Sequence, residues 1–190
     1  MSAALILAAG GGTRFGDDPK LLADVDGTPV LEHVARNASD VPNIQQVVVV
    51  LGAHSGVIRE RVDFGAARVV VCEDWADGQS ASLRCGLEAL GDAARKVVVL
   101  LGDQPLVTPR AIEWLACEPA GSRASYQGRP GHPVVLGPRL VQEAKALEGD
   151  RGLRDLVRWR MVEVGHLASD RDVDTPDDLE KIRDEARAVL

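Results

Sequence analysis

Apolar residues form two alternating patterns along roughly the first 120 residues of the chain. Continuous apolar runs at 47–51 and 97–101, like the shorter run at 5–7, contain no polar positions. Such runs are typical of strands covered on both faces in a parallel sheet. Between the runs, apolar residues recur at helical spacing, as in segment 30–38. The alternation of strands and helices with short connections predicts a doubly wound parallel sheet.

The pattern changes from about residue 120 onward. Short strands are predicted at 123–126, 134–136 and 161–164, and the first two flank a Gly/Pro-rich bend at 128–133. We therefore expect a three-layer α/β fold, with a mostly parallel mixed sheet between two layers of helices. Because no repeat, linker or low-complexity tract interrupts the 190 residues, we expect a single domain over residues 1–190.

Three Thr-Pro pairs mark predicted helix starts, with threonine as the N-cap and proline at the first helical position. They lie at 28–29, 108–109 and 175–176. Ser80 is expected to cap a further helix, and a short helix is predicted at 153–159.

The first apolar run ends at Gly10, Gly11 and Gly12, and Arg14 and Lys20 follow closely. Glycines directly after a strand let backbone N–H groups approach a ligand and turn toward it. Arg14 and Lys20 would add fixed positive charge beside these groups. This glycine loop is therefore predicted to hold a triphosphate.

Two common phosphate motifs do not account for the loop. A P-loop ends in Gly-Lys-Ser/Thr before a helix, and neither residues 12–13 nor residues 16–17 supply that ending. A dinucleotide fingerprint G-x-G-x-x-G starting at Gly10 needs glycine at position 15, where the chain has Phe15. A plain glycine-rich turn between a strand and a helix remains the alternative.

Three aspartates are candidate metal ligands. Asp103 follows the apolar run 97–101, at the strand end where open α/β sheets bind ligands. Asp172 and Asp174 precede the last predicted helix. Mg²⁺ shared with a triphosphate takes one or two carboxylates and keeps several waters. The alternatives are that Asp103 belongs to an ordinary turn, and that the other two only stabilise a helix N-terminus.

Composition narrows the class of protein. The formal net charge of −7 argues against nucleic acid or a membrane as the main partner. The three cysteines have no metal-ligand spacing, which favours reduced thiols in a cytosolic interior. No apolar stretch reaches transmembrane length, and the N-terminal residues lack the features of a signal peptide. We therefore expect a soluble cytoplasmic protein.

His132 lies in the Gly/Pro-rich bend. The usual expectation there is a solvent-facing turn residue, and the alternative is a hydrogen bond to a substrate phosphate. Trp75, Trp114 and Trp159 are widely spaced and are predicted to pack rather than to stack on a cofactor.

Six stretches, in this order, resemble the MobA-like nucleotidyltransferase family, and more closely its molybdenum cofactor cytidylyltransferase branch. They are Leu-Ala-Ala-Gly-Gly-Gly-Thr-Arg-Phe-Gly at 7–16 with Pro-Lys-Leu-Leu at 19–22, Gly-Gln-Ser-Ala-Ser-Leu at 78–83, Gly-Asp-Gln-Pro at 102–105, Gly-His-Pro-Val at 131–134, Gly-Asp-Arg-Gly-Leu-Arg at 149–154 and Asp-Val-Asp-Thr-Pro at 172–176. The likeness spans nearly the whole chain and implies a Rossmann-like nucleotidyltransferase fold.

The resemblance implies roles for individual residues. The implied catalytic residues are Arg14, Lys20 and Asp103, and the implied metal ligands are Asp103, Asp174 and Asp172. The implied nucleotide-binding residues are Leu7, Ala8, Ala9, Gly10, Gly11, Gly12, Lys20, Gly78, Gln79 and Ser80. His132, Arg151 and Arg154 resemble the acceptor side.

The resemblance also implies a reaction. The family's cytidylyl enzymes look like Leu-Ala-Ala-Gly at the loop entry and its guanylyl enzymes like Leu-Ala-Gly-Gly, so Ala9 favours CTP. CMP would pass from CTP to the terminal phosphate of molybdopterin, with Mg²⁺ as cofactor and pyrophosphate as the other product. A molybdoenzyme or its chaperone would be a candidate protein partner.

Other functions stay open. Some members of the family carry the name nicotine blue oxidoreductase, which implies hydride transfer with a nicotinamide cofactor, although the dinucleotide fingerprint fails here. A non-catalytic nucleotide-binding partner of a molybdoenzyme is a further alternative, although binding alone does not need a rigid metal carboxylate at Asp103. The acceptor could also be a different phosphate, such as a sugar or alcohol phosphate.

Overall fold

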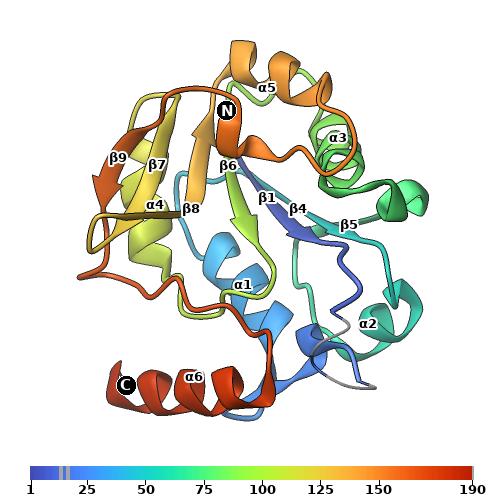
Figure 1. Ribbon diagram of the computed structural model, residues 1–190, viewed down its shortest axis with the longest axis vertical. Helices are drawn as coiled ribbons and strands as arrows, with labels where there is room; N and C mark the ends of the chain where they lie inside the picture. The colour runs from blue at the N-terminus through green and yellow to red at the C-terminus, as the bar shows by residue number, and fades with distance from the viewer. Residues whose placement is uncertain (13–14, 16–17, 190) are drawn as a thin grey trace.

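A seven-stranded mixed sheet forms the centre of the computed structural model, which describes residues 1–12, 15 and 18–189 (Figure 1). Its strands are β1 (Ser2–Ala8), β4 (Gln46–Leu51), β5 (Arg68–Val71), β6 (Lys96–Leu101), β7 (Ser122–Tyr126), β8 (Arg129–Leu136) and β9 (Arg160–Glu163). They lie in the order β5-β4-β1-β6-β8-β7-β9. β8 is antiparallel to both of its neighbours and the other pairs are parallel. The predicted mostly parallel mixed sheet is confirmed.

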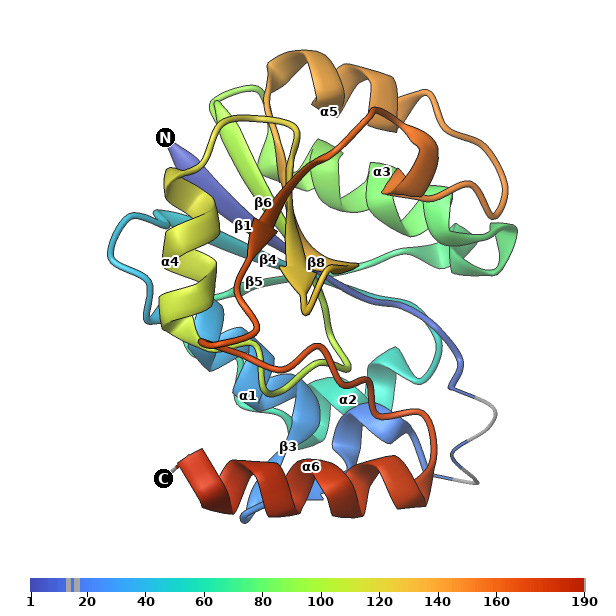
Figure 2. The same cartoon turned by 60° about the vertical axis from the view of Figure 1, so that its left-hand side comes forward.

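Helices cover both faces of the sheet, as Figures 1 and 2 show. The helices of the structure are α1 (Val30–Ser39), α2 (Ser55–Arg61), α3 (Gln79–Leu90), α4 (Pro109–Cys117), α5 (Pro138–Lys145) and α6 (Pro176–Val189). Ile6 and Val49 are buried with residues of α1 and α4, whereas Leu5 and Val50 are buried with residues of α3 and α5. Because successive strand residues face opposite layers, every position of the central strands must be apolar.

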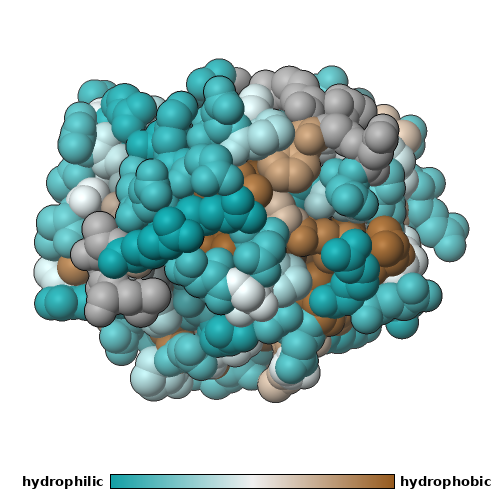
Figure 3. Space-filling view, turned by 90° about the horizontal axis from the view of Figure 1, so that it is seen from below, coloured by the Kyte–Doolittle hydropathy of each residue, from teal (hydrophilic) through white to brown (hydrophobic). Residues whose placement is uncertain are grey.

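The last helix lies apart from these layers, beyond the end of the sheet at which β1 and β6 finish (Figures 1 and 2). It packs on a small hairpin of β2 (Asp24–Val25) and β3 (Thr28–Pro29), where Val25 and Ile182 are buried in one cluster. Hydrophilic side chains cover most of this end of the molecule (Figure 3). Among the described residues, no helix combines the length and apolarity needed to cross a bilayer.

Two of the three predicted Thr-Pro helix starts are confirmed. Thr108 caps α4, accepting a hydrogen bond from the N–H of Ala111 at 3.3 Å, and Thr175 precedes α6 in the same way. The prediction for residues 28–29 is wrong: they form β3, and α1 begins at Val30 without a side-chain cap. The preceding residues 26–27 are Asp-Gly with positive φ at both, a two-residue hairpin turn that places residue 28 in a strand.

Three further local predictions need correction. Gly78, and not Ser80, occupies the N-cap of α3. The helix predicted at 153–159 is only a 3₁₀ turn at Leu153–Asp155. The bend predicted at 128–133 is also wrong in extent, because the chain turns at 127–128 and β8 already begins at residue 129. β8 pairs with β6 only over 134–136, so its two prolines precede the part bonded on both sides.

Candidate active site

The glycine loop leaves the carboxyl end of β1, as predicted. Gly12 has φ +57°, which favours glycine, and a Cβ there would lie 3.2 Å from Cγ of Lys20. Gly11 faces the indole of Trp75, and a Cβ on Gly11 would lie 3.9 Å from the nearest ring carbons. The glycines thus leave room for the two side chains that flank the loop. Arg14, the other predicted cation, lies outside the described residues.

The ammonium of Lys20 lies between two carboxylates that are distant in sequence. Its Nζ donates to Oδ2 of Asp103 at 2.6 Å and to Oδ1 of Asp174 at 2.8 Å. Burial by itself lowers the pKa of Lys20, but the two carboxylates outweigh burial and raise this pKa above its ordinary value. The lysine is therefore a permanent cation that is already shared by two anions.

These groups line a cavity of about 210 Å³, which we call the glycine-loop cavity. Its lining residues are Leu7, Ala8, Gly10, Gly12, Lys20, Leu21, Asp103 and Asp174. They come from the end of β1 and the glycine loop, the 3₁₀ turn at Lys20–Leu22, the residues after β6 and the segment before α6. The structure therefore brings together, at the carboxyl edge of the sheet, residues that the sequence predicted separately.

The donor set fits a hard divalent cation bound together with a nucleotide. Asp103 and Asp174 approach the same ammonium, so their oxygens lie close enough to face one small cation. No group of three or more metal-ligating side chains occurs among the described residues. Two carboxylates leave coordination positions for phosphate oxygens and water, which is the usual arrangement for Mg²⁺.

Asp172 has a different partner from the other two aspartates. Its Oδ1 accepts a hydrogen bond from Nε2 of Gln104 at 2.7 Å, and it does not line the glycine-loop cavity. Desolvation, followed by repulsion from Asp103 and Asp174, raises the pKa of Asp172 to about 6. Of the two candidates before α6, Asp174 is the one that shares a cation with Asp103.

The segment at 78–80 is held against the segment at 149–152. Ser80 donates its hydroxyl to the carbonyl oxygen of Gly149 at 2.7 Å. A Cβ on Gly78, where φ is +112°, would lie 2.6 Å from that same carbonyl group. A Cβ on Gly152 would lie 2.1 Å from Oε1 of Gln79. The two motifs, about 70 residues apart in sequence, therefore form one wall.

That wall bounds a second cavity, of about 410 Å³, which we call the arginine cavity. It is lined by Leu7, Gln79, Leu83, Arg123, His132, Val134, Asp150, Arg151, Gly152, Leu153 and Arg154. All three predicted acceptor-side residues are present, together with Gln79 from the predicted nucleotide side. Leu7 borders this cavity and the glycine-loop cavity, so the two adjoin.

His132 is half-buried in β8 and lines the arginine cavity, so it is not a solvent-facing turn residue. Burial, with a smaller contribution from the charge of Arg123, lowers the pKa of His132 to about 4. The imidazole is therefore neutral at pH 7. Tyr126 donates its hydroxyl to the backbone carbonyl of His132 at 2.7 Å and fixes this part of the strand.

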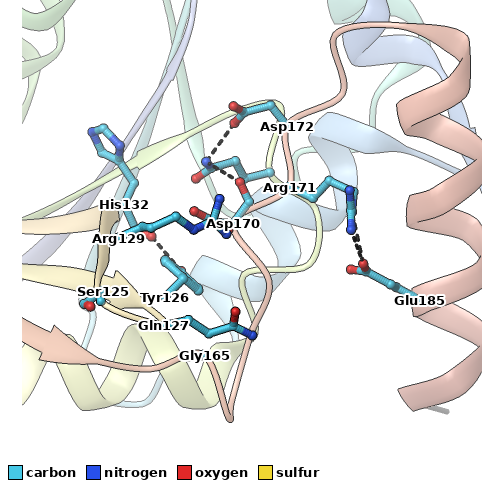
Figure 4. Close-up of polar contacts among 12 residues, drawn as sticks. Ser125, Tyr126, Gln127, Arg129, His132, Gly165, Asp170, Arg171, Asp172 and Glu185 are labelled. Carbon is cyan, nitrogen blue, oxygen red and sulfur yellow. Dashed lines mark hydrogen bonds and ion pairs between the residues drawn. The ribbon is translucent and has the colours of Figure 1, made fainter.

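A third cavity, of about 710 Å³, lies between β7, the segment 165–174 and α6 (Figure 4). Arg171 pairs with Glu185 of α6 at 2.7 Å, and Asp172 and Asp174 also line the space. The lining carboxylates outnumber the arginines. No sequence pattern predicted this cavity, because its lining residues between positions 126 and 129 are far in the chain from the segment 165–174 and α6 and meet them only in the folded protein.

Comparison with known proteins identifies the family. The model of the MobA-like NTP transferase domain matches residues 4–165. The chain is 28% identical to nicotine blue oxidoreductase from Paenarthrobacter nicotinovorans, over 94% of each chain. It is 31% identical to the bifunctional protein GlmU from Maricaulis maris over 76% of this chain, but spans only 32% of that longer protein.

Solved structures agree with the family model. A nucleotidyl transferase from Methanothermobacter, Mth528, superposes with a TM-score of 0.84 at 25% identity, covering 100% of this chain and 99% of that one. Rv0371c from Mycobacterium tuberculosis, in a complex with manganese, gives a TM-score of 0.76 at 27% identity over 96% and 97% of the two chains. The chain belongs to the MobA-like NTP transferase family, and its fold is that of a nucleotidyltransferase.

Proposed function

We propose that the protein transfers CMP from CTP to the terminal phosphate of a molybdopterin-type acceptor and releases pyrophosphate. The observation that carries the proposal is the pairing of two adjoining cavities at one edge of the sheet. One contains Lys20, Asp103 and Asp174 beside the glycine loop, and the other contains arginines and His132. A nucleotidyl transfer needs such a pair of sites, one for each phosphate-bearing substrate.

On the nucleotide side, we propose that the backbone of Gly10–Gly12 and the charge of Lys20 hold the triphosphate. Leu7, Ala8 and Ala9 would border the nucleoside, with Gly78, Gln79 and Ser80 facing it from the N-cap and first turn of α3. Support for CTP over GTP comes from Ala9, since the loop entry Leu-Ala-Ala-Gly looks like that of the family's cytidylyl enzymes. Arg14 would add a second cation.

We propose Asp103 and Asp174 as the carboxylates that hold Mg²⁺, with Asp172 outside the immediate shell. When bound, the ion would neutralise phosphate charge and act as a Lewis acid on the α-phosphate. The manganese complex of the relative Rv0371c supports a divalent cation in this family. Lys20 would exchange part of its contact with the carboxylates for a phosphate oxygen as the nucleotide enters.

The chemical step then balances without a covalent enzyme intermediate. An oxygen of the acceptor phosphate attacks the α-phosphorus of CTP, the bond from that phosphorus to the bridging oxygen of the β-phosphate breaks, and pyrophosphate leaves in line. The residues of the chain hold the two substrates in register and stabilise the charge that develops on the leaving group. A molybdoenzyme or its chaperone in the cytoplasm would receive the product.

Thermal unfolding with Mg²⁺ and CTP, GTP, ATP or UTP in turn tests this proposal. A ligand at about a hundred times its Kd adds roughly 2.7 kcal/mol to the free energy of unfolding. We expect the largest stabilisation with CTP, dependent on Mg²⁺ and lost in Asp103→Asn. The matched control is Asp92→Asn, because Asp92 is exposed and follows the C-terminal end of α3, whereas Gln79 of the arginine cavity lies at its N-terminal end. Stabilisation by GTP alone would contradict the cytidylyl assignment.

Transfer is tested by following radiolabelled CMP onto molybdopterin, with glucose 1-phosphate as an alternative acceptor. Binding of CTP without transfer to any acceptor would favour the non-catalytic alternative.

The name of the relative from Paenarthrobacter motivates a second candidate function, hydride transfer from a nicotinamide cofactor. Stabilisation by NADH, with none by any triphosphate, would make that candidate the leading one.

A further inference from the structure

Three arginines face the arginine cavity without a carboxylate partner among the described side chains. Arg123 comes from β7, and Arg151 and Arg154 come from the segment before β9. Within the described side chains, none of the three makes an ion pair. By contrast, Arg129 and Arg171 at the third cavity both lie within 4 Å of a carboxylate.

Arg123 is held in a fixed position. Its Nε donates to the carbonyl oxygen of Gly131 at 2.9 Å, across the β7–β8 hairpin. Within the described residues, the two terminal nitrogens of the guanidinium have no hydrogen-bond partner. The side chain is half-buried, and desolvation together with the nearby charge of Arg154 lowers the pKa of Arg123. A half-buried cation beside a second one is unfavourable unless an anion compensates both.

The charges of the two cavities differ in sign. In the glycine-loop cavity, two carboxylates face one ammonium, so an anionic ligand there needs a metal ion. In the arginine cavity, three arginines face one carboxylate, Asp150, which leaves a net charge of +2 with His132 neutral. A phosphomonoester carries a charge between about −1.5 and −2 at pH 7. Such a group would neutralise the arginine cavity without a metal.

We propose that Arg123 is a specificity-determining residue that binds, together with Arg154, the phosphate of a phosphomonoester acceptor. The planar guanidinium of Arg123, with Nε already tied to the strand, presents its remaining N–H groups to two phosphate oxygens. The inference deepens the proposed function, since it takes the arginine cavity as the acceptor side. It assigns the recognised chemical group, a phosphate dianion, and a residue outside every motif that the sequence analysis found.

Binding of inorganic phosphate, measured by calorimetry without nucleotide or metal, tests the site. A Lys20→Met background removes the cation of the glycine loop, so that the arginine cavity dominates the signal. In this background we expect Arg123→Met and Arg154→Met each to weaken phosphate binding at least tenfold. Arg139→Met is the matched control, because Arg139 is an exposed residue of α5 whose ion pair is with Glu143 of the same helix. This control variant should bind phosphate with unchanged affinity.

Arg154→Met keeps the test decisive if Arg123→Met disturbs the hairpin, since the side chain of Arg154 is exposed and, among the described side chains, makes no hydrogen bond or ion pair. Unchanged phosphate binding in Arg154→Met, or in a folded Arg123→Met, overturns the inference. The inference is also overturned if Arg123→Met, in the native background, loses stabilisation by Mg²⁺ and CTP to the same extent as it loses phosphate binding. The arginine would then serve the nucleotide.

The failures of the two proposals are distinguishable. If the wild-type protein transfers no CMP, yet the arginine variants bind phosphate more weakly than their parent, the phosphate site stands and the proposed function fails. If CMP transfer occurs, and neither phosphate affinity nor the KM for the acceptor changes in Arg123→Met, the proposed function stands and the role of Arg123 is wrong.

Discussion

The two cavities at the carboxyl edge of the sheet treat positive charge in opposite ways. In the glycine-loop cavity Lys20 is bonded to Asp103 and Asp174, whereas in the arginine cavity Arg123 and Arg154 have no carboxylate partner among the described residues. The first arrangement is stable without ligand and needs a metal ion to accept more negative charge. The second favours an anion directly. The contrast is the basis of our proposal that the glycine-loop cavity takes a phosphate together with a metal ion and the arginine cavity takes one without.

The largest effect is expected from substitutions of the aspartates, which test whether the glycine-loop cavity holds the metal ion. Asp174→Asn should reduce CMP transfer at least about a hundredfold, as loss of a preorganised charge does in other active sites. Asp172→Asn should retain activity within about tenfold, because an asparagine oxygen can still accept from Gln104. Steady-state transfer rates at saturating Mg²⁺ would distinguish the two, and equal losses would contradict the different roles given to them.

Acidification should lower the free energy of unfolding through His132, which lines the arginine cavity. Its pKa is lowered from 6.5 to about 4 in the folded protein, so between these values the unfolded chain binds more protons and the free energy of unfolding falls as pH falls. The full difference corresponds to about 3 kcal/mol. Urea unfolding from pH 7 to pH 4 should show this loss in wild type and a smaller loss in His132→Gln. If the free energy of unfolding fell equally with pH in both proteins, His132 would not be the source of the loss.

One wall of the arginine cavity depends on the contact between residues 78 and 149. Gly78→Ala places a Cβ 2.6 Å from a backbone carbonyl and demands φ of +112°, so we expect a destabilisation of about 2 kcal/mol. Gly56→Ala is the matched control, since a Cβ there meets nothing within 4 Å and lies in α2. The control should be neutral or slightly stabilising. Denaturant midpoints of both variants provide the measurement.

A smaller effect is expected at the start of α6. Thr175 accepts a hydrogen bond from the N–H of Asp178 at 3.2 Å and donates to its carboxylate at 2.7 Å. Thr175→Ala should cost about 1 kcal/mol, the usual value for an N-cap. Because Asp174 is the adjacent residue, the affinity for Mg²⁺ and CTP should fall while phosphate binding in the arginine cavity stays constant. A change confined to phosphate binding would reverse the assignment of the two cavities.

Much of the glycine-loop cavity could be predicted because its parts lie at strand ends. Ala8, Asp103 and the glycines follow apolar runs, and the carboxyl ends of parallel strands meet at one edge. Arg123 could not be predicted in the same way. It occupies a strand position among ordinary residues, and only the pairing of β7 with β8 turns it toward His132 and Arg154. Nor could the sequence decide between Asp172 and Asp174, which differ by two positions before the same helix.

The sequence by itself determined the layered α/β architecture, the glycine loop and two of the three helix starts. These features are set by local patterns: uninterrupted apolar runs, glycine where φ is positive, and threonine before proline. The tertiary structure decided the partners of each charge, the hairpin at residues 24–29 and the contact between segments 78–80 and 149–152. Those depend on groups far apart in the chain, whose distances are fixed only when the core has packed.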